Sequence, residues 1–588
     1  MVEDNSKKFN KNIITTELLI AGGGTGGIAA AIQAARLGID VTIVSETRWL
    51  GGMLTSAGVS CIDGNYELPA GIFGEFRENL FDYYGNAENL KTGWVSHVNF
   101  EPHVANDILH EMAKPYDNLK IYYEFKFHNL EVERRKIHKV SFRNSANKII
   151  QFKAAIVIEA TEFGDLAEAA GCKYHLGIDG PNYAEHNPNV QDLTWVAILK
   201  KYKNSKDSLI SKPNSYDPAE FHGCCEEAST SEYPSDIQAD RMLSYGKLPN
   251  NKYMLNWPIR GNDYYASVFD LTQDERQEVW EQAKEYTLNM LYFIQNELGY
   301  KNIGLADEFP SDDKLALIPY NRESRRFAGY TRLKIDHILQ PYNYELYKRG
   351  IAVGDYPIDH HHSRNPEKIE ESFPPIPSFT VPYDCLISSD IDNIILAEKN
   401  ISVSHVVNGS TRLQPVVMQM GQAAGISAAI SIENSILPKN LNIRYLQKIL
   451  LDNGGYLMPF VDVTKDDDAF EAVQRTAVAG LFQGEGVPDK WANKTYFRPA
   501  EFVTARDFEL IKSELLNSKI QLESEIDESP VDPADIIDFL RKEVKQTLDY
   551  DDRYLTSKSI TRKELACLLD KNLNLFSKPI YINRKGKR

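Results

Sequence analysis

Apolar residues near the amino terminus form two short runs that flank a glycine-rich turn and an alanine-rich stretch. The first run ends with residues 18–21, the turn covers residues 22–27, and residues 28–37 have the composition of a helix that stops at Gly38. Residues 39–45 are β-branched and apolar, which is typical of a buried parallel strand. This order of strand, turn, helix and strand predicts a βαβ unit of an α/β fold.

The turn has the spacing of a dinucleotide-binding loop. Gly22, Gly24 and Gly27 match the pattern G-x-G-x-x-G. In this pattern the first glycine permits the tight turn, the second lets the backbone approach a pyrophosphate, and the third lets the helix pack on the strand. The amides at the start of the helix would face the anion. Glu46 follows the second run, where a carboxylate accepts hydrogen bonds from an adenosine ribose. A nucleotide site is therefore predicted, with a purely structural turn as the alternative.

The composition and the hydrophobic pattern of the chain change three times along its length, which predicts four segments. Residues 13–174 hold the βαβ unit, and residues 381–435 return to its pattern. Between them, residues 175–380 are rich in Tyr, Asn, Asp and Pro, as expected for an inserted α+β cap that builds a substrate pocket. Residues 456–588 predict a small helical appendage. Further strands are predicted at residues 119–127, 154–160 and 391–397, and residues 130–142 predict strands that flank a turn at residues 134–136. Helices are predicted at residues 72–84, 166–170, 272–296, 416–430 and 469–478, and one more follows residues 100–104 and ends at residue 112.

Charge and composition narrow the class of protein. The 588 residues include 66 Lys and Arg against 83 Asp and Glu, and the net charge of -17 argues against nucleic acid or an anionic membrane as a partner. No apolar run reaches the roughly 18 residues of a membrane span. Residues 1–12 lack the apolar core of a signal peptide, although a signal removed earlier would leave the same sequence. The compartment and the oligomeric state stay open.

Three separated blocks carry a resemblance to a known family. They are residues 22–52, residues 159–166 and residues 400–425. In this combination the chain resembles FAD-dependent oxidoreductases of the glutathione-reductase-like flavoprotein superfamily, some of whose members are described as xanthan-lyase-like. The resemblance extends from about residue 15 to residue 435. It implies a Rossmann-like domain, split in sequence by the cap, with FAD as the cofactor.

The appendage has a looser resemblance, to S-layer-homology-type repeats. Its two helix entries look alike, and Thr504 and Thr561 are the expected helix N-caps. One copy of the repeat is fairly complete and the other is partial.

The resemblance implies contacts for each part of FAD. The positive end of a helix beginning near Gly421 would stabilise negative charge on the reduced ring. One departure is the segment Ala397-Glu398-Lys399-Asn400, because such flavoproteins often carry Gly-Asp or Gly-Arg there for the ribityl contact. The implied cofactor residues are Gly22, Gly24 and Gly27 for the pyrophosphate, Glu46 for the ribose, Arg48, Gly51, Gly52 and Met53 along the pyrophosphate and flavin, Phe127 for adenine, Thr161, Gly164 and Asp165 closing over the cofactor, and Gly421 and Ala424 in the flavin-facing helix.

Three residues are candidates for the chemistry beside the flavin. His405 lies between the late strand and the flavin-facing helix, and it is the first candidate for the base; a packed histidine is the alternative. Arg412 is expected to bind an anionic substrate group or the flavin C2 oxygen, or else to be a plain helix-entry arginine. Arg325 is expected in the substrate cavity, or else in a buried ion-pair network that joins the cap to the nucleotide domain.

Two other segments have open interpretations. The triplet His360-His361-His362 follows Asp359 and suggests a metal site. Because no second ligand cluster has a regular spacing, we expect a histidine-rich loop over the cavity and no metal. Residues 256–265 combine aromatic and polar groups, as on a sugar-stacking surface or in a packed cap turn.

The cysteines exclude one class of flavoprotein. Six scattered cysteines without a C-x-x-C pair predict neither a disulfide framework nor a zinc site, and Cys61 has no nearby partner for a disulfide reductase. Cys224 and Cys225 are adjacent, which strains a disulfide, so two ordinary thiols are expected.

These features favour an FAD-dependent dehydrogenase or oxidase that moves a hydride to flavin from a polar hydroxyl compound, such as a sugar or glycan fragment. Because no second G-x-G-x-x-G unit predicts an NAD(P)H domain, oxygen or an external electron acceptor is the expected oxidant. Two alternatives stay open. One is an amine or amino-acid oxidase in which Arg412 or Arg325 holds a carboxylate. The other is a surface-associated binding protein with structural FAD, in which the appendage carries the function.

Overall fold

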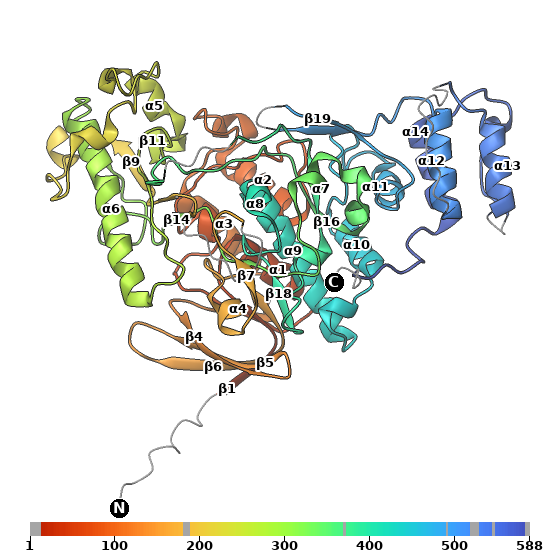
Figure 1. Ribbon diagram of the computed structural model, residues 1–588, viewed down its shortest axis with the longest axis horizontal. Helices are drawn as coiled ribbons and strands as arrows, with labels where there is room; N and C mark the ends of the chain where they lie inside the picture. The colour runs from red at the N-terminus through yellow and green to blue at the C-terminus, as the bar shows by residue number, and fades with distance from the viewer. Residues whose placement is uncertain are drawn as a thin grey trace, which may run out of the picture.

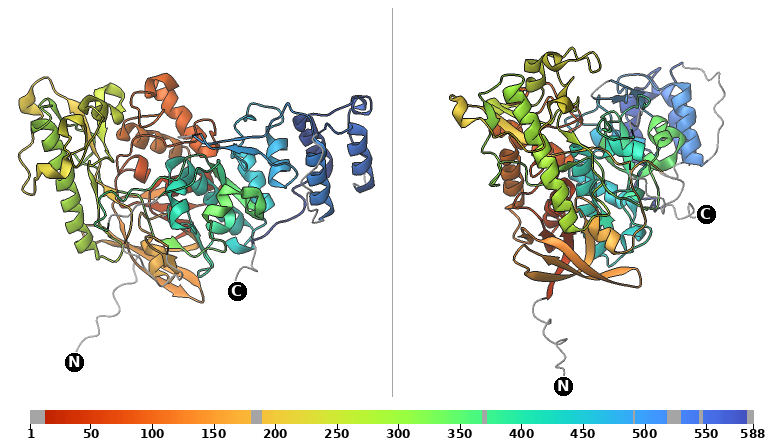
Figure 2. Two further views of the ribbon diagram at one scale, coloured as in Figure 1. Left: turned by 45° about the horizontal axis from the view of Figure 1, so that its top comes forward. Right: turned by 60° about the vertical axis from the view of Figure 1, so that its left-hand side comes forward.

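The cap lies at one end of the protein and the last helices of the chain at the other, with the nucleotide-binding domain and its mixed sheet between and below them (Figure 1). The left view of Figure 2 shows the same order of parts. The computed structural model describes residues 13–179, 189–367, 372–489, 492–517, 529–543 and 547–582.

The sheet contains seven of the described strands, five of which are joined by parallel pairings as in a Rossmann-like fold. Apolar residues fill the parallel strands because helices cover the sheet. Across the sheet the order is β3 (Leu119–Tyr122), β2 (Val41–Val44), β1 (Ile13–Ala21), β6 (Ile149–Glu159), β5 (Lys136–Arg143) and β4 (Lys126–Glu133), with β18 (Ile394–Leu396) also paired to β6. The five strands joined in parallel are β3, β2, β1, β6 and β18.

Strand β6 joins the two sequence halves of the nucleotide-binding fold. Its amino-terminal part pairs antiparallel with β5, where Phe152 lies opposite Val140. Its carboxy-terminal part pairs in parallel with β18, where Val157 lies opposite Ile394. The strand is therefore longer than the predicted residues 154–160, because one hairpin and one parallel partner share it. The α/β class and the sequence split around a cap are confirmed.

Helices α1 (Thr25–Arg36) and α9 (Gln414–Glu433) cross at very close range beside this sheet. A Cβ at Gly421 would lie 2.2 Å from the carbonyl oxygen of Gly26, and one at Gly425 would lie 2.5 Å from that of Ala30. The small residues of α9 are therefore explained by helix packing. Among the described helices, α9 alone has the length and hydropathy of a membrane span, and 94% of that window is buried inside the protein.

We expect Gly421→Ala to lower the free energy of unfolding by about 1–3 kcal/mol, because an added methyl group overpacks this crossing. Thermal denaturation of the purified protein measures the effect. Glu433→Ala, at the exposed end of the same helix, is the matched control and should leave the melting temperature nearly unchanged. Equal melting temperatures for Gly421→Ala and the unchanged protein would show that the two helices have room to separate.

The cap has a core of its own, built from antiparallel strands and one long helix. Trp195, Trp257 and Trp280 belong to this core, which also takes in Met53 from the nucleotide domain. Helix α6 (Gln273–Asn296) begins with a capping box between Thr272 and Glu275, which confirms the predicted helix 272–296. The other cap elements are β8 (Leu193–Thr194), β9 (Ala197–Lys201), β10 (Lys247–Leu248), β11 (Lys252–Leu255), β12 (Asp263–Tyr264), β13 (Ile303–Leu305), β14 (Tyr320–Asn321) and α5 (Ala239–Tyr245).

Further elements connect the cap to the sheet and complete the nucleotide domain. Helices α2 and α3 begin and end within a few residues of the predicted segments. These elements are α2 (Gly71–Tyr84), α3 (Pro102–Ala113), α4 (Asp165–Ala169), α7 (Ile335–Leu339), α8 (His405–Thr411), β7 (Tyr174–His175) with β15 (Arg326–Phe327), and β16 (Gly350–Gly354) with β17 (Phe379–Pro382).

The carboxy-terminal part is mainly helical, and its apolar core is continuous with that of the nucleotide domain. Thr504 and Thr561 each cap a helix through a capping box, as the sequence predicts. The likeness to S-layer-homology-type repeats stays a prediction. The elements are α10 (Ile443–Asp452), α11 (Phe470–Val478), α12 (Ala505–Leu516), α13 (Pro533–Glu543), α14 (Arg562–Leu573), β19 (Glu485–Val487) and β20 (Lys494–Tyr496).

Candidate functional site

The glycine-rich turn lies at the carboxyl ends of the parallel strands β1, β2 and β6. Gly22 has a φ of 108°, its N–H donates to the Val44 carbonyl at 2.8 Å, and a Cβ there would lie 1.9 Å from the Ala160 carbonyl oxygen. A Cβ at Gly27 would lie 2.1 Å from the Gly22 carbonyl oxygen. Only glycine fits either position, so the turn has the close approach that a dinucleotide loop requires.

A second glycine pair lies directly on this turn. The Gly51 N–H donates to the Gly23 carbonyl at 2.8 Å, and the Thr25 hydroxyl donates to the Gly51 carbonyl at 2.8 Å. A Cβ at Gly52 would lie 2.8 Å from the Gly24 Cα. The two predicted glycine motifs therefore form one structure at the amino-terminal end of α1.

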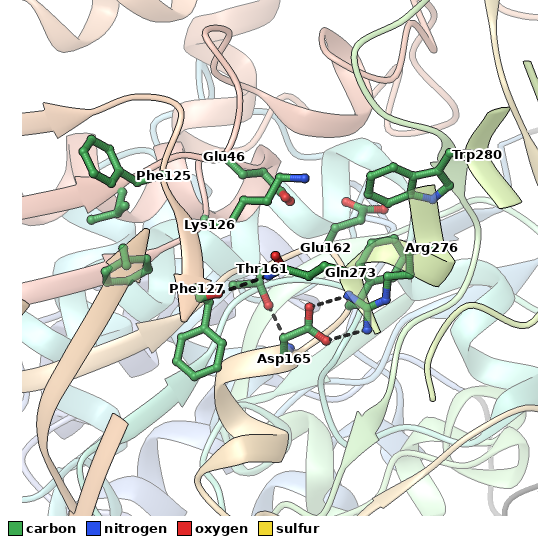
Figure 3. A pocket seen from close by; sticks show the side chains of 14 residues that line it. Glu46, Phe125, Lys126, Phe127, Thr161, Glu162, Asp165, Gln273, Arg276 and Trp280 are labelled. Carbon is green, nitrogen blue, oxygen red and sulfur yellow. Dashed lines mark hydrogen bonds and ion pairs between the residues drawn. The ribbon is translucent and has the colours of Figure 1, made fainter. Parts of the chain in front are cut away.

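Beside the turn lies a narrow pocket of about 40 Å³, where Figure 3 shows Glu46, Phe127, Thr161 and Asp165 converging. The pocket adjoins a wider groove of about 520 Å³, to which Arg48 contributes. Burial raises the pKa of Glu46 against the opposing charge of Lys126. The place predicted for adenosine thus has a carboxylate for the ribose hydroxyls and aromatic side chains for the base. Its aromatic lining is Phe125, Phe127, Phe142, Phe163 and Trp280.

Asp165 anchors the cap to the nucleotide domain. Its carboxylate accepts hydrogen bonds from Arg276 of α6 at 2.7 and 2.9 Å, and from Arg325 at 2.9 Å. Gly164, with a φ of 73°, lies immediately before it and begins α4. The structure therefore corrects the prediction that Arg325 lies in the substrate cavity, because its guanidinium is engaged by Asp165 and by the Phe163 carbonyl. The alternative interpretation, an ion pair between the two domains, is the one observed.

The start of α1 is already occupied by a carboxylate of the protein. The Gly26 N–H donates to Oε1 of Glu398 at 2.7 Å, and the same oxygen would lie 2.4 Å from a Cβ at Gly24. Glu398 is buried, and burial raises its pKa to about 7 against the opposing pull of Lys399 and of hydrogen bonds from Gly26 and Gly27. Lys399 itself is paired with Glu162, which lines the adenosine pocket.

These residues fit FAD on one condition. The glycine cradle and the adenosine pocket suit the cofactor, but a pyrophosphate and the ionised Glu398 compete for the same amides at the helix start. Binding therefore requires that Glu398 takes up a proton or turns away. The sequence signal was present in the segment Ala397-Glu398-Lys399-Asn400, which departs from the Gly-Asp or Gly-Arg that the resemblance implies there.

The helix that was expected to face the flavin lies close to the predicted residues 416–430, but its positive end is not near Gly421, where the resemblance placed it. Helix α9 starts at Gln414, so Gly421 and Ala424 lie two turns inside it and pack in the core rather than at its positive end. This corrects their assignment as flavin contacts. At the true helix start, the Gln414 side chain accepts from the Asp63 N–H at 3.2 Å and donates to the Asp63 carboxylate at 3.3 Å. Burial, with the nearby charge of Asp359, raises the pKa of Asp63 to about 6.

A chain of charged groups extends from this helix start into the cap. Arg412, immediately before α9 and fully buried, donates to Asp359 at 2.9 Å and to the Tyr320 hydroxyl. Asp359 lies 3.6 Å from Nε2 of His361, whose Nδ1 lies 2.8 Å from Asp263. Arg412 therefore has partners of its own, which the sequence alone did not reveal.

The charges in this chain stabilise one another. Burial opposes ionisation of Asp359, but His361 and Arg412 hold its pKa well below the usual range. Burial and the nearby Arg322 disfavour a charged His361, but Asp359 and Asp263 outweigh them and raise its pKa. Arg322, 3.0 Å from Asp263, helps to lower the pKa of that buried carboxyl to about 2. Sequence reasoning missed Asp63, which lies in no recognisable motif, and it named Asp263 only as part of residues 256–265, without its partners.

His405 occupies a different environment from Arg412. It is the first residue of α8, its main-chain N–H donates to Asp179 at 2.9 Å, and its Nδ1 lies 3.6 Å from Glu323. Seven residues separate it from Arg412, which is about two helical turns. The three catalytic candidates thus lie in three places: His405 beside Glu323, Arg412 beside Asp359, and Arg325 beside Asp165. Their assigned roles as base and substrate ligand stay predictions for His405 and Arg412.

The described cysteines agree with the sequence. All six are free thiols, and the sulfur atoms of Cys224 and Cys225 are 3.8 Å apart. Burial raises the pKa of Cys61 well above its usual value, so it has none of the character of a redox-active thiolate.

Comparisons with known proteins identify the family. The family model described as FAD dependent oxidoreductase matches residues 17–450, well over half of the chain. The chain therefore belongs to the FAD-dependent oxidoreductases, and the expected resemblance, the class of enzyme and the cofactor are confirmed. No curated protein matches the chain.

Solved structures add distant likenesses. One is a geranylgeranyl bacteriochlorophyll reductase-like protein from Thermoplasma acidophilum, at 11% identity and a TM-score of 0.34, covering 79% of this chain and 92% of that one. Another is the anhydrotetracycline hydroxylase OxyS from Streptomyces rimosus, at 10% identity and a TM-score of 0.35, covering 79% and 72%. At these values the likenesses add nothing to the family assignment.

Proposed function

We propose that the protein is a dehydrogenase or oxidase for a polar hydroxyl compound, with a sugar or glycan fragment as the first candidate. The supporting observation is a groove of about 550 Å³ in the cap, lined by Tyr264, Tyr265 and Tyr286 among polar side chains. Aromatic faces stack on sugar rings, while carboxylate and amide groups bond to hydroxyls. The polar lining includes Ser215, Asp217, Glu220, Gln282, Glu285, Asn289 and Arg364.

The groove leads to the charged chain before α9. Asp263 lines the groove and is also the partner of His361. A substrate in the groove would therefore lie on the cap side of the contact between His361 and Asp359. When bound, FAD supplies a hydride acceptor. The protein then has to bind the substrate and accept the hydroxyl proton. We assign this proton to Nε2 of His361 in its neutral form, in which Nδ1–H donates to Asp263.

Anaerobic mixing of the FAD-loaded protein with a panel of sugars, polyols, hydroxy acids and amino acids tests this proposal. We expect bleaching of flavin absorbance by at least one neutral polyhydroxy compound. Tyr264→Ala should raise KM for that compound about tenfold or more, since a lost stacking contact is worth about 0.5–1.5 kcal/mol beyond the buried area. Tyr83→Ala, an exposed tyrosine on α2, is the control. Bleaching by amino acids alone would replace the proposal with amino-acid oxidation, and bleaching by nothing in the panel would reject it.

A further inference from the structure

We propose that His360, His362 and His405 bind a divalent transition-metal ion, with Zn²⁺ as the first candidate. Each side chain offers one ring nitrogen, and the three ligand atoms lie within 4.8 Å of one another. His362 and His405 are buried and His360 is half-buried. Three imidazoles that converge in this way form the ligand set of an open Zn²⁺ site, in which water or a carboxylate takes the fourth position.

Two of the ligands come from alternate residues of one segment. The rings of His360 and His362 lie toward His405, with centroids 4.4 and 5.5 Å from its ring. His361, between them, turns instead to Asp263. The expectation of no metal was based on the lack of a second ligand cluster near the triplet. That reason does not hold, because the start of α8 brings His405 to the segment from 43 residues further along the chain.

The ring of His360 is already set in a ligand orientation. Its Nε2 lies 3.2 Å from the Val406 carbonyl oxygen, which only accepts hydrogen bonds, so Nε2 carries the proton and Nδ1 carries the lone pair. A Cβ at Gly409 would lie 2.4 Å from Cδ2 of this ring. The glycine in α8 therefore makes room for the imidazole, and a backbone carbonyl of the same helix selects its tautomer, as is usual for metal-binding histidines.

His405 has an equivalent partner on its other nitrogen. Its Nδ1 lies 3.6 Å from Oε1 of Glu323, and we assign Nε2 as the atom that binds the ion. Glu323 is buried and forms an ion pair with Arg326. A carboxylate behind a ligating imidazole raises its basicity and directs its ring.

A second cluster among the described residues has a different chemistry. Glu101, His103 and Glu308 also converge, but the ammonium group of Lys252 lies 2.6 Å from Glu101 and 2.5 Å from Glu308. That group of carboxylates already holds a cation of the protein. The three-histidine group is made of imidazoles, which suit Zn²⁺, and a bound ion would fasten the segment after Asp359 to the start of α8.

Metal titration of the full-length protein, stripped with EDTA and assayed with and without FAD, tests the proposal. We expect one Zn²⁺ per chain by calorimetry, and visible ligand-field absorption when Co²⁺ is bound instead. His362→Ala and His405→Gln should each weaken binding at least 100-fold and remove the Co²⁺ band. Glu323→Gln retains all three imidazoles and should weaken binding about 10–100-fold. His128→Ala, on the exposed face of β4, is the matched control and should bind as the unchanged protein does.

Metal binding by the unchanged protein is enough to decide the test, whether or not the variants fold. If it takes up neither Zn²⁺ nor Co²⁺ at micromolar concentration, the proposal is overturned. The same conclusion follows if a folded His362→Ala variant shows the full Co²⁺ band. Because the FAD-free protein is included, a failure of metal binding is distinguishable from a failure of the proposed oxidation.

Discussion

Replacing Glu398 by Gln is expected to tighten FAD binding about tenfold at pH 8. In the unchanged protein the carboxylate accepts a hydrogen bond from the Gly26 N–H at the start of α1, where the pyrophosphate has to bind. With a pKa of about 7, Glu398 is mostly ionised at pH 8, and protonating it there costs about 1.4 kcal/mol, which is a factor of ten. The amide of Gln carries no charge and removes this cost.

The same argument fixes the pH dependence. Binding takes up a proton above pH 7, so the affinity of the unchanged protein should fall as the pH rises from 6 to 8, while that of Glu398→Gln should stay nearly level. The charged groups that face Glu398 are Lys399 and Glu162, which are paired with each other. Quenching of flavin fluorescence measures both affinities, with Glu433→Gln as the control for a lost surface charge. A Glu398→Gln protein that binds no more tightly at pH 8 would show that the side chain moves aside at no cost.

The second large effect is expected at Arg412. We expect Arg412→Met to lower the midpoint potential of the bound flavin by about 30–60 mV, because a buried cation before the start of α9 favours the negatively charged reduced ring. This range corresponds to about 1.4–3 kcal/mol for a two-electron couple. Equilibration with a reference dye during slow anaerobic reduction measures the potential without any need for the substrate.

Two further variants test whether the positive charge of Arg412 causes the shift in midpoint potential. Arg412→Lys retains the charge beside Asp359 and should recover most of the potential, whereas Arg36→Met removes a cation that pairs with Glu75 at the far end of α1 and should change nothing. Arg412→Met also leaves Asp359 with fewer partners, so a lower melting temperature is expected as well. An unchanged potential in a folded Arg412→Met protein would place the arginine outside the influence of the flavin.

Local chemistry made much of the fold predictable. The glycine spacing from Gly22 to Gly27 and the apolar runs around it identified the βαβ unit, because the tight turn itself needs glycine: Gly22 has a positive φ, and a Cβ at Gly27 would lie 2.1 Å from the Gly22 carbonyl oxygen. Helix α6 was predicted to within a residue, since Thr272 and Glu275 form a capping box that involves only neighbours in sequence. The turn at residues 134–136 was equally local, and both arginines in it have positive φ.

Distant pairing explains what the sequence did not reveal. Arg325 donates a hydrogen bond to Asp165, 160 residues away in sequence, and Gly26 donates one to Glu398, 372 residues away. No local sequence pattern therefore predicts either contact. Gly421 was assigned to the flavin because a glycine at a helix start and a glycine at a helix crossing look the same in one sequence. The distinction depends on where α9 begins, and Pro415 in its first turn was the available signal.

The site therefore divides into a part that follows from motifs and a part that follows from tertiary structure. Glu46, Phe127, Thr161 and Asp165 were predicted and do line one pocket. The charged chain through Asp359 and His361 was not predicted as a unit, because its members come from the cap, from the segment after β16 and from the residue before α9.

The closure of strand β18 against β6 has a consequence for biosynthesis. A Cβ at Gly26 would lie 1.7 Å from the Ala397 carbonyl, so the amino-terminal turn is shaped in part by a segment made some 370 residues later. During translation the first βαβ unit therefore emerges long before the segment around Ala397 leaves the ribosome, and until then its apolar strands stay partly exposed to solvent. Nascent chains that end before residue 397 should consequently depend on chaperones and retain no yellow pigment.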